Sequence, residues 1–271
     1  MAMRFVVRRS APARWAVVMA ATLAGMWGIG VDVARADPDA LWRIVHDQCV
    51  PDDEANRDPA PCANVDLDDG VDRGYAVLKD RVGATQYLLI PTARITGIES
   101  PALLEPGATN YFAAAWRART FTEARAGGPL PRDWISLTIN SAVARSQSQL
   151  HIHVDCLRAD VHALLSVFSG QIGDTWAPFP VPLAGQTYNA MAIPGEELDG
   201  VNPFALLADG LPDARAEMGL QTLAVVGTYR PDGRPGFVVL QDRADPETGN
   251  RAAAEQLQDH AYCPPSPAPM P

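Results

Sequence analysis

Two histidines stand one residue apart in the run Q-L-H-I-H-V-D-C at residues 149–156. The alternation of polar and apolar residues predicts a β-strand over this range, in which every second side chain lies on the same face. Gln149, His151, His153 and Asp155 then share one face, and the apolar residues between them face the core. A row of imidazole and carboxylate groups can transfer protons, attack an electrophile or bind a metal ion.

The residues just before this run predict the partner strand of a hairpin. Residues 134–140 also alternate and end at Asn140, and the residues 141–148 that follow are rich in Ser, Arg and Gln. Hydroxyl, guanidinium and amide groups of this kind suit the binding of an anion. A hairpin that brings Asn140 and a loop containing Ser146 beside two histidines therefore resembles a phosphate-handling site.

Three hypotheses account for the histidine pair. The first is a polar, solvent-facing strand edge with no chemical role. In the second, His151 and His153 bind a metal ion together with one further ligand, which is Asp155, His46, His162 or His260. In the third, one imidazole attacks phosphorus, because neutral imidazole is a good nucleophile near pH 7 and forms a phosphoramidate that water can break. This third mechanism requires no metal and no cofactor.

The composition is that of an ordinary globular protein, and 271 residues suffice for one large domain or two small ones. The formal net charge is −10, and five of the 22 basic residues lie within the first 36 positions. The remainder is still more acidic, which argues against nonspecific nucleic-acid binding. Lys79 is the single lysine in the chain, and its rarity makes it a candidate functional residue.

The N-terminus has the features of an export segment. Four arginines precede an uncharged run from Trp15 to Val31, and the small-residue sequence Ala34-Arg-Ala36 follows. This order predicts a signal peptide cleaved after Ala36 or an uncleaved signal anchor within residues 1–36. Both interpretations keep the four arginines in the cytoplasm and place the rest of the chain on the exported, periplasmic face of the inner membrane.

Export changes the interpretation of the four cysteines. An even number of cysteines in an oxidising compartment suggests two disulfides, for which three pairings exist. We favour Cys49–Cys62, because a polar, Pro-rich segment separates them, and Cys156–Cys263 then remains as the second pair. The alternative is four free, buried thiols.

The pattern along the chain predicts an α+β fold around antiparallel sheets. Predicted strands cover 75–79, 86–90, 134–140, 149–156, 188–193, 223–229 and 237–241. Predicted helices cover 38–49, 110–126, 160–168 and 251–260, with further helix starts at Ser100-Pro101 and Asn202-Pro203. Residues 264–271 form a Pro-rich tail that is predicted to be disordered.

Particular residues carry a resemblance to a known family. The Q-L-H-I-H-V run is similar to the signature of the histidine triad superfamily, which has three histidines at alternate positions and in which Gln149 would stand first. The predicted strand–strand–helix–strand–strand order of residues 75–156 is similar to that fold. Within the superfamily, five ordered blocks resemble the bacterial CDP-diacylglycerol pyrophosphatases. They are L-W-R-I-V-H-D-Q-C, Y-L-L-I-P-T-A-R-I-T-G-I-E-S-P, L-T-I-N-S, R-S-Q-S-Q-L-H-I-H and L-Q-D-H-A-Y-C, within residues 41–263.

The resemblance implies a histidine triad-like antiparallel sheet with packed helices, extended by a second α+β half, in one catalytic domain at residues 37–263. It also implies hydrolysis of the pyrophosphate of CDP-diacylglycerol, at the membrane, to CMP and phosphatidate through a cytidylyl-histidine intermediate. Two other functions compete with it. One is a metal-dependent exported phosphoesterase, and the other is a non-enzymatic nucleotide- or lipid-binding protein.

The resemblance also assigns roles to the histidines and their neighbours. By match to the superfamily motif, His151 takes the position of the nucleophile, and His153 takes a position that hydrogen-bonds the phosphate. Asn140 and Ser146 match polar residues that orient the site and contact phosphate oxygens. Gln149 departs from the three-histidine pattern, since its amide can bond phosphate but carries no charge.

Two further assignments concern the ends of the substrate. Lys79 and Asp80 fall where the superfamily meets the nucleotide, and an acidic residue at that place contacts ribose hydroxyls. For the lipid end, we expect the apolar segment 176–183 to line a groove for the acyl chains.

Overall fold

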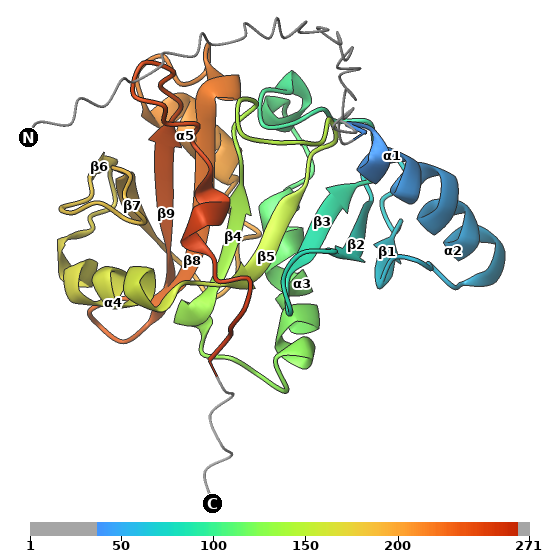
Figure 1. Cartoon of the computed structure of the whole chain (residues 1–271), viewed down its shortest axis with the longest axis horizontal. Coiled ribbons are helices and arrows are strands. Elements are labelled where there is room, and N and C mark those ends of the chain that lie inside the picture. The colour runs from blue at the N-terminus through green and yellow to red at the C-terminus, as the bar shows by residue number, and fades with distance from the viewer. Residues whose placement is uncertain (1–36, 265–271) are drawn as a thin grey trace, which may run out of the picture. The chain divides into compact units, whose positions relative to one another are not determined.

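Nine antiparallel strands form one continuous sheet in the computed structural model (Figure 1). The structure describes residues 37–264, so the predicted export segment and residues 265–271 of the predicted tail lie outside the described residues. In chain order the strands are β1 (Asn64–Asp66), β2 (Tyr75–Lys79), β3 (Tyr87–Pro91), β4 (Ile135–Ile139), β5 (Ile152–Cys156), β6 (Ala177–Pro178), β7 (Asn189–Pro194), β8 (Gln221–Tyr229) and β9 (Pro235–Arg243). Across the sheet their order is β1-β2-β3-β5-β4-β8-β9-β7-β6.

Five α-helices are found among the described residues. They are α1 (Ala40–Ile44), α2 (Val50–Asn56), α3 (Tyr111–Arg125), α4 (Ala159–Phe168) and α5 (Pro203–Gly210). A π-helical turn, Val45–Cys49, joins α1 directly to α2. None of the helices within residues 37–264 has the length and apolar character needed to cross a membrane.

The two halves of the sheet repeat one topology. The elements β2, β3, α3, β4 and β5 give the spatial order β2-β3-β5-β4, and β6, β7, α5, β8 and β9 give the matching order β6-β7-β9-β8. The halves join where β4 pairs with β8, and Leu137 lies opposite Val225. The predicted strand–strand–helix–strand–strand order is therefore confirmed for the first half, and it recurs in the second.

One face of the sheet is covered by α3 and α5. Asn110 caps the N-terminus of α3, because its side-chain oxygen accepts a hydrogen bond from the backbone N–H of Ala113. The side chains of Phe112 and Trp116 from α3 and of Phe204 from α5 are buried in the same apolar cluster against the sheet. Burial of these large aromatic groups is a main contribution to holding both helices on this face.

The opposite face is covered mainly at its two ends, and this leaves a hollow at its centre. At one end, the α1–α2 segment packs on β2 and β3, with Val45 buried in one cluster with Leu78 and Leu88. At the other end, α4 and the C-terminal segment pack on β7, β8 and β9. Figure 1 shows the two coverings on either side of β4 and β5. A cavity lies over these two central strands.

Some sequence predictions are wrong in detail. The predicted helix at 251–260 is a single 3-10 turn, Ala254–Leu257. Contacts with the sheet replace helix formation there, because the N–H of Ala254 donates to Thr222 Oγ1 and the N–H of Glu255 donates to Asn140 Oδ1. The strand predicted from residue 149 starts at Ile152.

Other predicted boundaries also shift. The helix predicted at 38–49 continues to Asn56 through Pro51, which is tolerated because it stands in the first turn of α2. At Ser100-Pro101 the predicted helix is only a 3-10 turn, Pro101–Leu104. The strands predicted at 223–229 and 237–241 are confirmed as β8 and β9, and they form a hairpin with Gly233 at φ +77° in its turn.

Candidate active site

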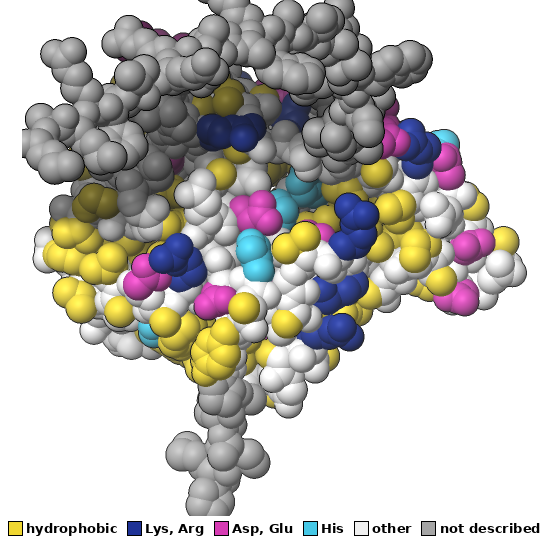
Figure 2. All heavy atoms as spheres, in the orientation of Figure 1, with side chains coloured by type: hydrophobic (Ala, Val, Ile, Leu, Met, Phe, Trp, Pro, Cys, Tyr) yellow, Lys and Arg dark blue, Asp and Glu magenta, His cyan; other side chains and the backbone are white. Residues whose placement is uncertain are grey.

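A cavity of about 530 Å³ lies over β5 and the end of β4, between α1 and the C-terminal segment. His151 and His153 form part of its lining, together with Asn140 and Glu255. Figure 2 shows histidine side chains beside acidic and basic ones in the middle of this face, with hydrophobic side chains around them. The structure thus brings together the two histidines and the end of the preceding strand, as the hairpin pattern predicts.

His151 is held in one tautomer. Its Nδ1 lies 2.7 Å from the backbone carbonyl oxygen of Gln149, and a carbonyl only accepts, so Nδ1 carries the proton. The lone pair is then on Nε2. Burial lowers the pKa of His151 below its ordinary value. The ring is therefore neutral near pH 7 and has a nucleophilic nitrogen in a side chain that lines the cavity.

His153 is held in the opposite tautomer. The side-chain amide N–H of Gln86 donates to Nδ1 of His153, which places the ring proton on Nε2. That Nε2 is buried and has no partner within the described part of the chain. Burial also lowers the pKa of His153. A buried N–H donor without an acceptor is costly, and a bound phosphate oxygen would satisfy it.

Asn140 holds the C-terminal segment at the cavity. Its Nδ2 donates to Oε2 of Glu255 at 2.9 Å, and its Oδ1 accepts the backbone N–H of Glu255 at 3.1 Å. These two bonds fix Glu255 against the histidine hairpin. Through them, Asn140 positions a glutamate that the sequence alone does not identify as part of the site.

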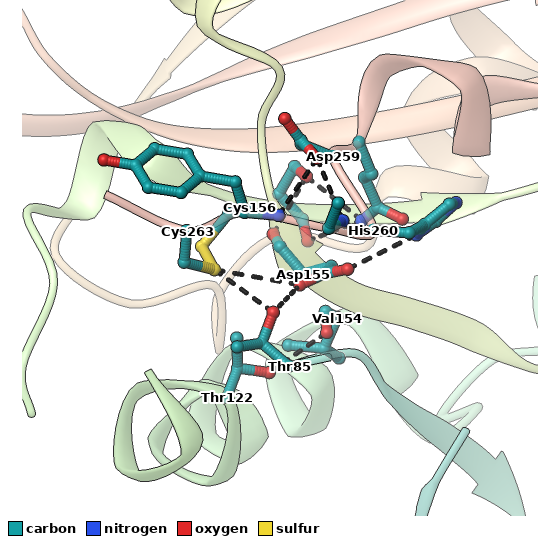
Figure 3. The surroundings of a disulfide bond; sticks show 12 residues. Thr85, Thr122, Val154, Asp155, Cys156, Asp259, His260 and Cys263 are labelled. Carbon is teal, nitrogen blue, oxygen red and sulfur yellow. Dashed lines mark hydrogen bonds and ion pairs between the residues drawn. A yellow bond between two sulfur atoms is a disulfide. The ribbon is translucent and has the colours of Figure 1, made fainter. Parts of the chain in front are cut away.

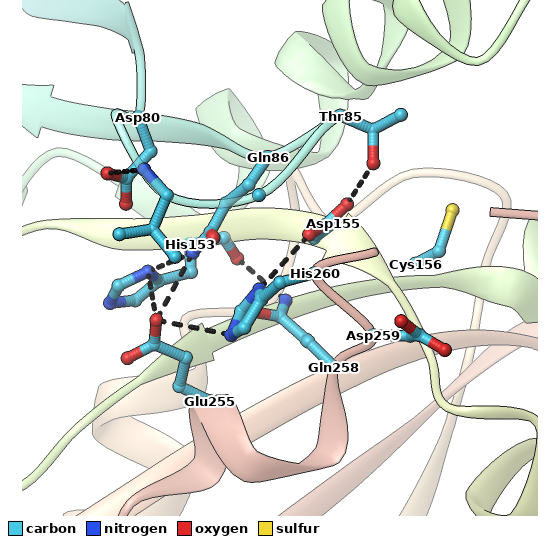
Figure 4. Close-up of polar contacts among 12 residues, drawn as sticks. Asp80, Thr85, Gln86, His153, Asp155, Cys156, Glu255, Gln258, Asp259 and His260 are labelled. Atoms are coloured by element: carbon cyan, nitrogen blue, oxygen red, sulfur yellow. Dashed lines mark hydrogen bonds and ion pairs between the residues drawn. The ribbon is translucent and has the colours of Figure 1, made fainter. Parts of the chain in front are cut away.

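Glu255 connects His153 to another histidine (Figure 4). Its Oε1 lies 3.5 Å from Nδ1 of His153 and 3.5 Å from Nε2 of His260. Burial alone would raise the pKa of Glu255, but the amide donors of Asn140 and Gln86 and the nearby His260 outweigh it, and the net shift is downward. Glu255 is therefore an ionised carboxylate in the wall of the cavity.

His260 lies between two carboxylates. Its Nδ1 donates to Oδ2 of Asp155 at 3.4 Å, while its Nε2 faces Glu255. The hydrogen bond to Asp155 raises the pKa of His260. Asp155 is fully buried and accepts the hydroxyl proton of Thr85 at 2.6 Å (Figure 3). Asp155 thus positions His260 and does not line the cavity, although it shares the strand face of His153.

The predicted nucleotide contacts, Lys79 and Asp80, both line the cavity. The ammonium of Lys79 donates to the carbonyl oxygens of Asp80 and Gly83, at 2.8 and 2.9 Å. Asp80 in turn accepts the backbone N–H of Val82. Both residues therefore also stabilise the turn between β2 and β3.

Of the two remaining residues predicted to contact substrate, one lines the cavity and the other does not. Ser146 is exposed and lines the cavity. Gln149 is buried and does not line it, because its amide donates to the carbonyl oxygens of Pro91 and Ala93. These bonds tie the start of the histidine segment to the end of β3, and its role toward substrate stays a prediction.

Two basic residues of the cavity wall, Arg81 and Arg145, lie outside the predicted set. Arg145 lines the cavity, and both terminal nitrogens of its guanidinium group donate to Glu99. Its place in the loop before the histidines is the only sequence signal for it. A guanidinium held in this way is oriented before a phosphate arrives.

Both predicted disulfides, Cys49–Cys62 and Cys156–Cys263, are present. Cys156 ends β5 on the core side, and Cys263 follows the segment that carries Glu255 and His260. Figure 3 shows this disulfide beside Asp155 and His260. The bond therefore fixes the C-terminal segment to the histidine strand.

The metal hypothesis requires the side-chain ligand atoms of His151, His153 and one further residue to lie close together. Among the described residues, one group of three metal-binding side chains has closely spaced ligand atoms, and it consists of Asp155 and the disulfide-bonded Cys156 and Cys263. His162 instead stacks on Trp134. The described chain therefore does not assemble the ligand set that the hypothesis names.

The segment 176–183, which we expected to line a groove for the acyl chains, does not line the histidine cavity. Phe179 and Leu183 are buried in the cluster on β7, β8 and β9, so the segment covers the core. Trp176 packs in the cluster on the α5 face of the sheet. Apolar residues of α1, β2 and β3 line the histidine cavity instead, and they include Leu41, Ile44, Leu78 and Leu88.

Comparison with known proteins shows which family this chain resembles. Residues 36–264 match the family described as CDP-diacylglycerol pyrophosphatase. The chain is also 45% identical over 225 residues to a CDP-diacylglycerol pyrophosphatase of Yersinia pestis. This alignment covers 83% of the present chain and 84% of its relative.

Proposed function

This chain belongs to the CDP-diacylglycerol pyrophosphatase family and hydrolyses CDP-diacylglycerol, and we propose that it does so through a covalent cytidylyl-His151 intermediate. Hydrolysis of the pyrophosphate bond gives CMP and phosphatidate. The single observation that carries the proposal is the hydrogen bond from His151 Nδ1 to the carbonyl oxygen of Gln149. It leaves the lone pair of Nε2 free for in-line attack on phosphorus.

In the first step, Nε2 of His151 attacks the phosphorus that bears cytidine. The Nε2–P bond forms as the bond from that phosphorus to the bridging oxygen breaks, and the electron pair of that bond leaves with phosphatidate. The ring keeps its Nδ1 proton and becomes a cytidylyl-imidazolium. Phosphatidate is a weak base, so its departure needs little help from an acid.

His153 and Arg145 are the candidates for stabilising the charge of the transferred group. The orphan Nε2–H of His153 donates to a phosphate oxygen in this proposal, and the guanidinium of Arg145 compensates the negative charge. Ser146 and Asn140 add hydroxyl and amide donors at the same wall. Positioning and electrostatic stabilisation of this kind supply most of the catalysis in phosphoryl transfer.

The cytidine is assigned to the side of the cavity formed by α1 and the β2–β3 turn. Asp80 supplies a carboxylate for the ribose hydroxyls, and Leu41, Leu78 and Leu88 supply an apolar wall for the base. Lys79 holds the turn that carries Asp80.

The proposal also includes the fold type of the site and the cellular location of the enzyme. A histidine triad-like arrangement is supported by the β2-β3-β5-β4 order and by the histidine spacing. Location at the inner membrane, on the periplasmic face, is supported by the basic and apolar order of residues 1–36 and by the two disulfides. Membrane association would also bring the enzyme to its lipid substrate.

A labelling experiment tests the covalent intermediate. The enzyme is mixed with CDP-diacylglycerol carrying radiolabel in the cytidylyl phosphate and quenched without acid. We expect label on the protein that is stable in base and lost in acid, as phosphoramidates are, and its absence from His151→Ala. An active His151→Ala enzyme would refute the assignment.

A chelator in the same assay addresses metal dependence. Turnover should be unchanged after incubation with chelator, because the proposed step uses His151 and fixed donors alone. Loss of turnover that added metal restores would favour the metal-dependent phosphoesterase instead.

A further inference from the structure

We propose that Glu255 is the base that activates water in the second half of the reaction, the hydrolysis of cytidylyl-His151. This inference rests on the covalent intermediate proposed above. The histidine pair does not supply such a base, because His151 carries the intermediate and His153 already accepts a hydrogen bond from Gln86 at its unprotonated nitrogen. The carboxylate of Glu255 lies beside them in the cavity wall.

The position of Glu255 is set from both sides. Its backbone N–H and its Oε2 are bonded to the two polar side-chain atoms of Asn140. Its Oε1 lies 3.5 Å from His153 and 3.5 Å from His260. The side chain is 28% exposed, and it lines the same cavity as His151. A water between this carboxylate and a phosphoryl group on His151 would therefore be inside the cavity.

The groups around Glu255 keep it ionised before water attacks. His260 faces its Oε1, and a hydrogen bond to Asp155 favours the protonated, cationic form of that histidine. Asp155 is in turn fixed by the hydroxyl of Thr85. His260 thus acts as a positioning residue, and Glu255 contacts the reacting water. The other charged groups of the cavity wall are Asp37, Lys79, Asp80, Arg81 and Arg145.

The second step balances with Glu255 as the only proton acceptor. The carboxylate takes one proton from water as the oxygen attacks phosphorus. The Nε2–P bond breaks, and its electron pair returns to Nε2. The ring retains its Nδ1 proton throughout, so His151 becomes neutral imidazole again without another proton donor. CMP leaves, and Glu255 then releases its proton to solvent.

The two steps have different requirements, which makes the proposal testable. Phosphatidate leaves without strong acid catalysis, but water is a poor nucleophile until a base removes its proton. Loss of the base should therefore slow the second step much more than the first. Covalent enzyme should then accumulate.

The test uses the full-length protein with Glu255→Gln. Glutamine keeps an oxygen that accepts from Asn140, so the segment should stay in place. We expect stoichiometric labelling of the protein with rapid release of phosphatidate, followed by CMP release about 10²–10⁴-fold slower than in the wild type. Glu54→Gln, which changes an exposed carboxylate on α2, is the matched control and should behave as the wild type.

Two outcomes would overturn the role of Glu255. One is CMP release within about threefold of the wild type. The other is a Glu255→Gln protein that is folded, by its thermal transition, yet neither turns over nor becomes labelled, since its first step would then be lost. If the wild type and Glu255→Gln both lack label while His151→Ala stays active, the covalent route itself is wrong.

A second variant separates the positioning role of His260 from a merely structural one. His260→Gln removes the cation beside Glu255, so the pKa of that carboxylate should rise. The acidic limb of the rate of CMP release should then move to higher pH, while the rate at alkaline pH falls less. An unchanged pH profile would contradict the role of His260.

Discussion

At the scale of single residues, the two cavity histidines differ in which nitrogen carries the proton. The carbonyl oxygen of Gln149 accepts from Nδ1 of His151, whereas the amide of Gln86 donates to Nδ1 of His153. One ring therefore presents a lone pair at Nε2, and the other presents an N–H there. A nucleophile and a donor are both needed at a phosphoryl group, so this division of tautomers gives each ring a separate task.

Substitution of the two histidines should have unequal effects. His151→Ala removes the attacking atom, and we expect turnover to fall below detection. His153→Ala removes one donor to the transition state and should reduce kcat by about 10²–10³-fold. The measurement is single-turnover release of CMP and phosphatidate by each purified variant. Equal residual rates would contradict the assignment.

The pH dependence of the first step should reflect the burial of His151. The neutral ring is the active form, and burial lowers its pKa from the ordinary value of 6.5. The acidic limb of kcat/KM should therefore lie below that pH, and activity should be retained as the pH falls from neutrality toward it. A pH profile of kcat/KM checks this, and an acidic limb above neutrality would contradict it.

At the scale of elements, the sequence predicted the histidine hairpin well and the C-terminal segment poorly. Alternation placed His151 and His153 on one face, because a strand has a side-chain period of two. Glu255 was missed, since no local pattern indicates that a residue 115 positions after Asn140 lies on the same cavity. Its segment has the pattern of a helix, and only the bonds from Asn140 and Thr222 explain why it forms a short turn.

The disulfide Cys156–Cys263 should matter for activity as well as for stability. It closes a separation of 107 residues, and the chain-entropy estimate for its loss is about 5 kcal/mol of the free energy of unfolding. Replacement of both cysteines by serine also releases the segment that carries Glu255 and His260. We therefore expect a large loss of stability together with a loss of CMP release, measured by urea unfolding and by turnover.

The other disulfide provides the matched control. Cys49–Cys62 closes a separation of 13 residues, for which the same estimate is about 3 kcal/mol. Replacement of these two cysteines by serine leaves the C-terminal segment tied to β5, so more activity should be kept. Equal losses of activity in the two variants, at a temperature where both are folded, would show that the tether has no specific effect on the site.

At the scale of the whole molecule, one sheet with a repeated topology carries the histidine site in its first half. The second half has the same strand order, but β9 (Pro235–Arg243) contains no histidine where β5 contains His153. The sequence could not reveal this repeat, because the two halves share an order of elements without a shared pattern of residues. The chain after β9 returns across the sheet and brings Glu255 to Asn140 at the end of β4, so the site needs both halves.

The pairing of β4 with β8 joins the two halves of the sheet through buried apolar contacts. These strands are buried at the centre of the sheet, and Leu137 and Val225 lie opposite each other in the apolar cluster under α3 and α5. A boundary between two independent domains would have few contacts across it. We therefore expect residues 37–263 to unfold as a single cooperative domain.

The two disulfides link the predicted export compartment to the active site. The two disulfides need an oxidising environment, and the basic and apolar order of residues 1–36 predicts export to one. A chain that starts at Asp37 and is made in a reducing cytoplasm should therefore carry four free thiols, unfold at a lower urea concentration and release CMP more slowly. Oxidation of the purified protein should restore both properties together, because the Cys156–Cys263 bond then holds Glu255 at the cavity again. The free thiols are counted before and after oxidation, and turnover is measured on the same samples. Full activity with all four thiols free would contradict the link between the disulfides and activity.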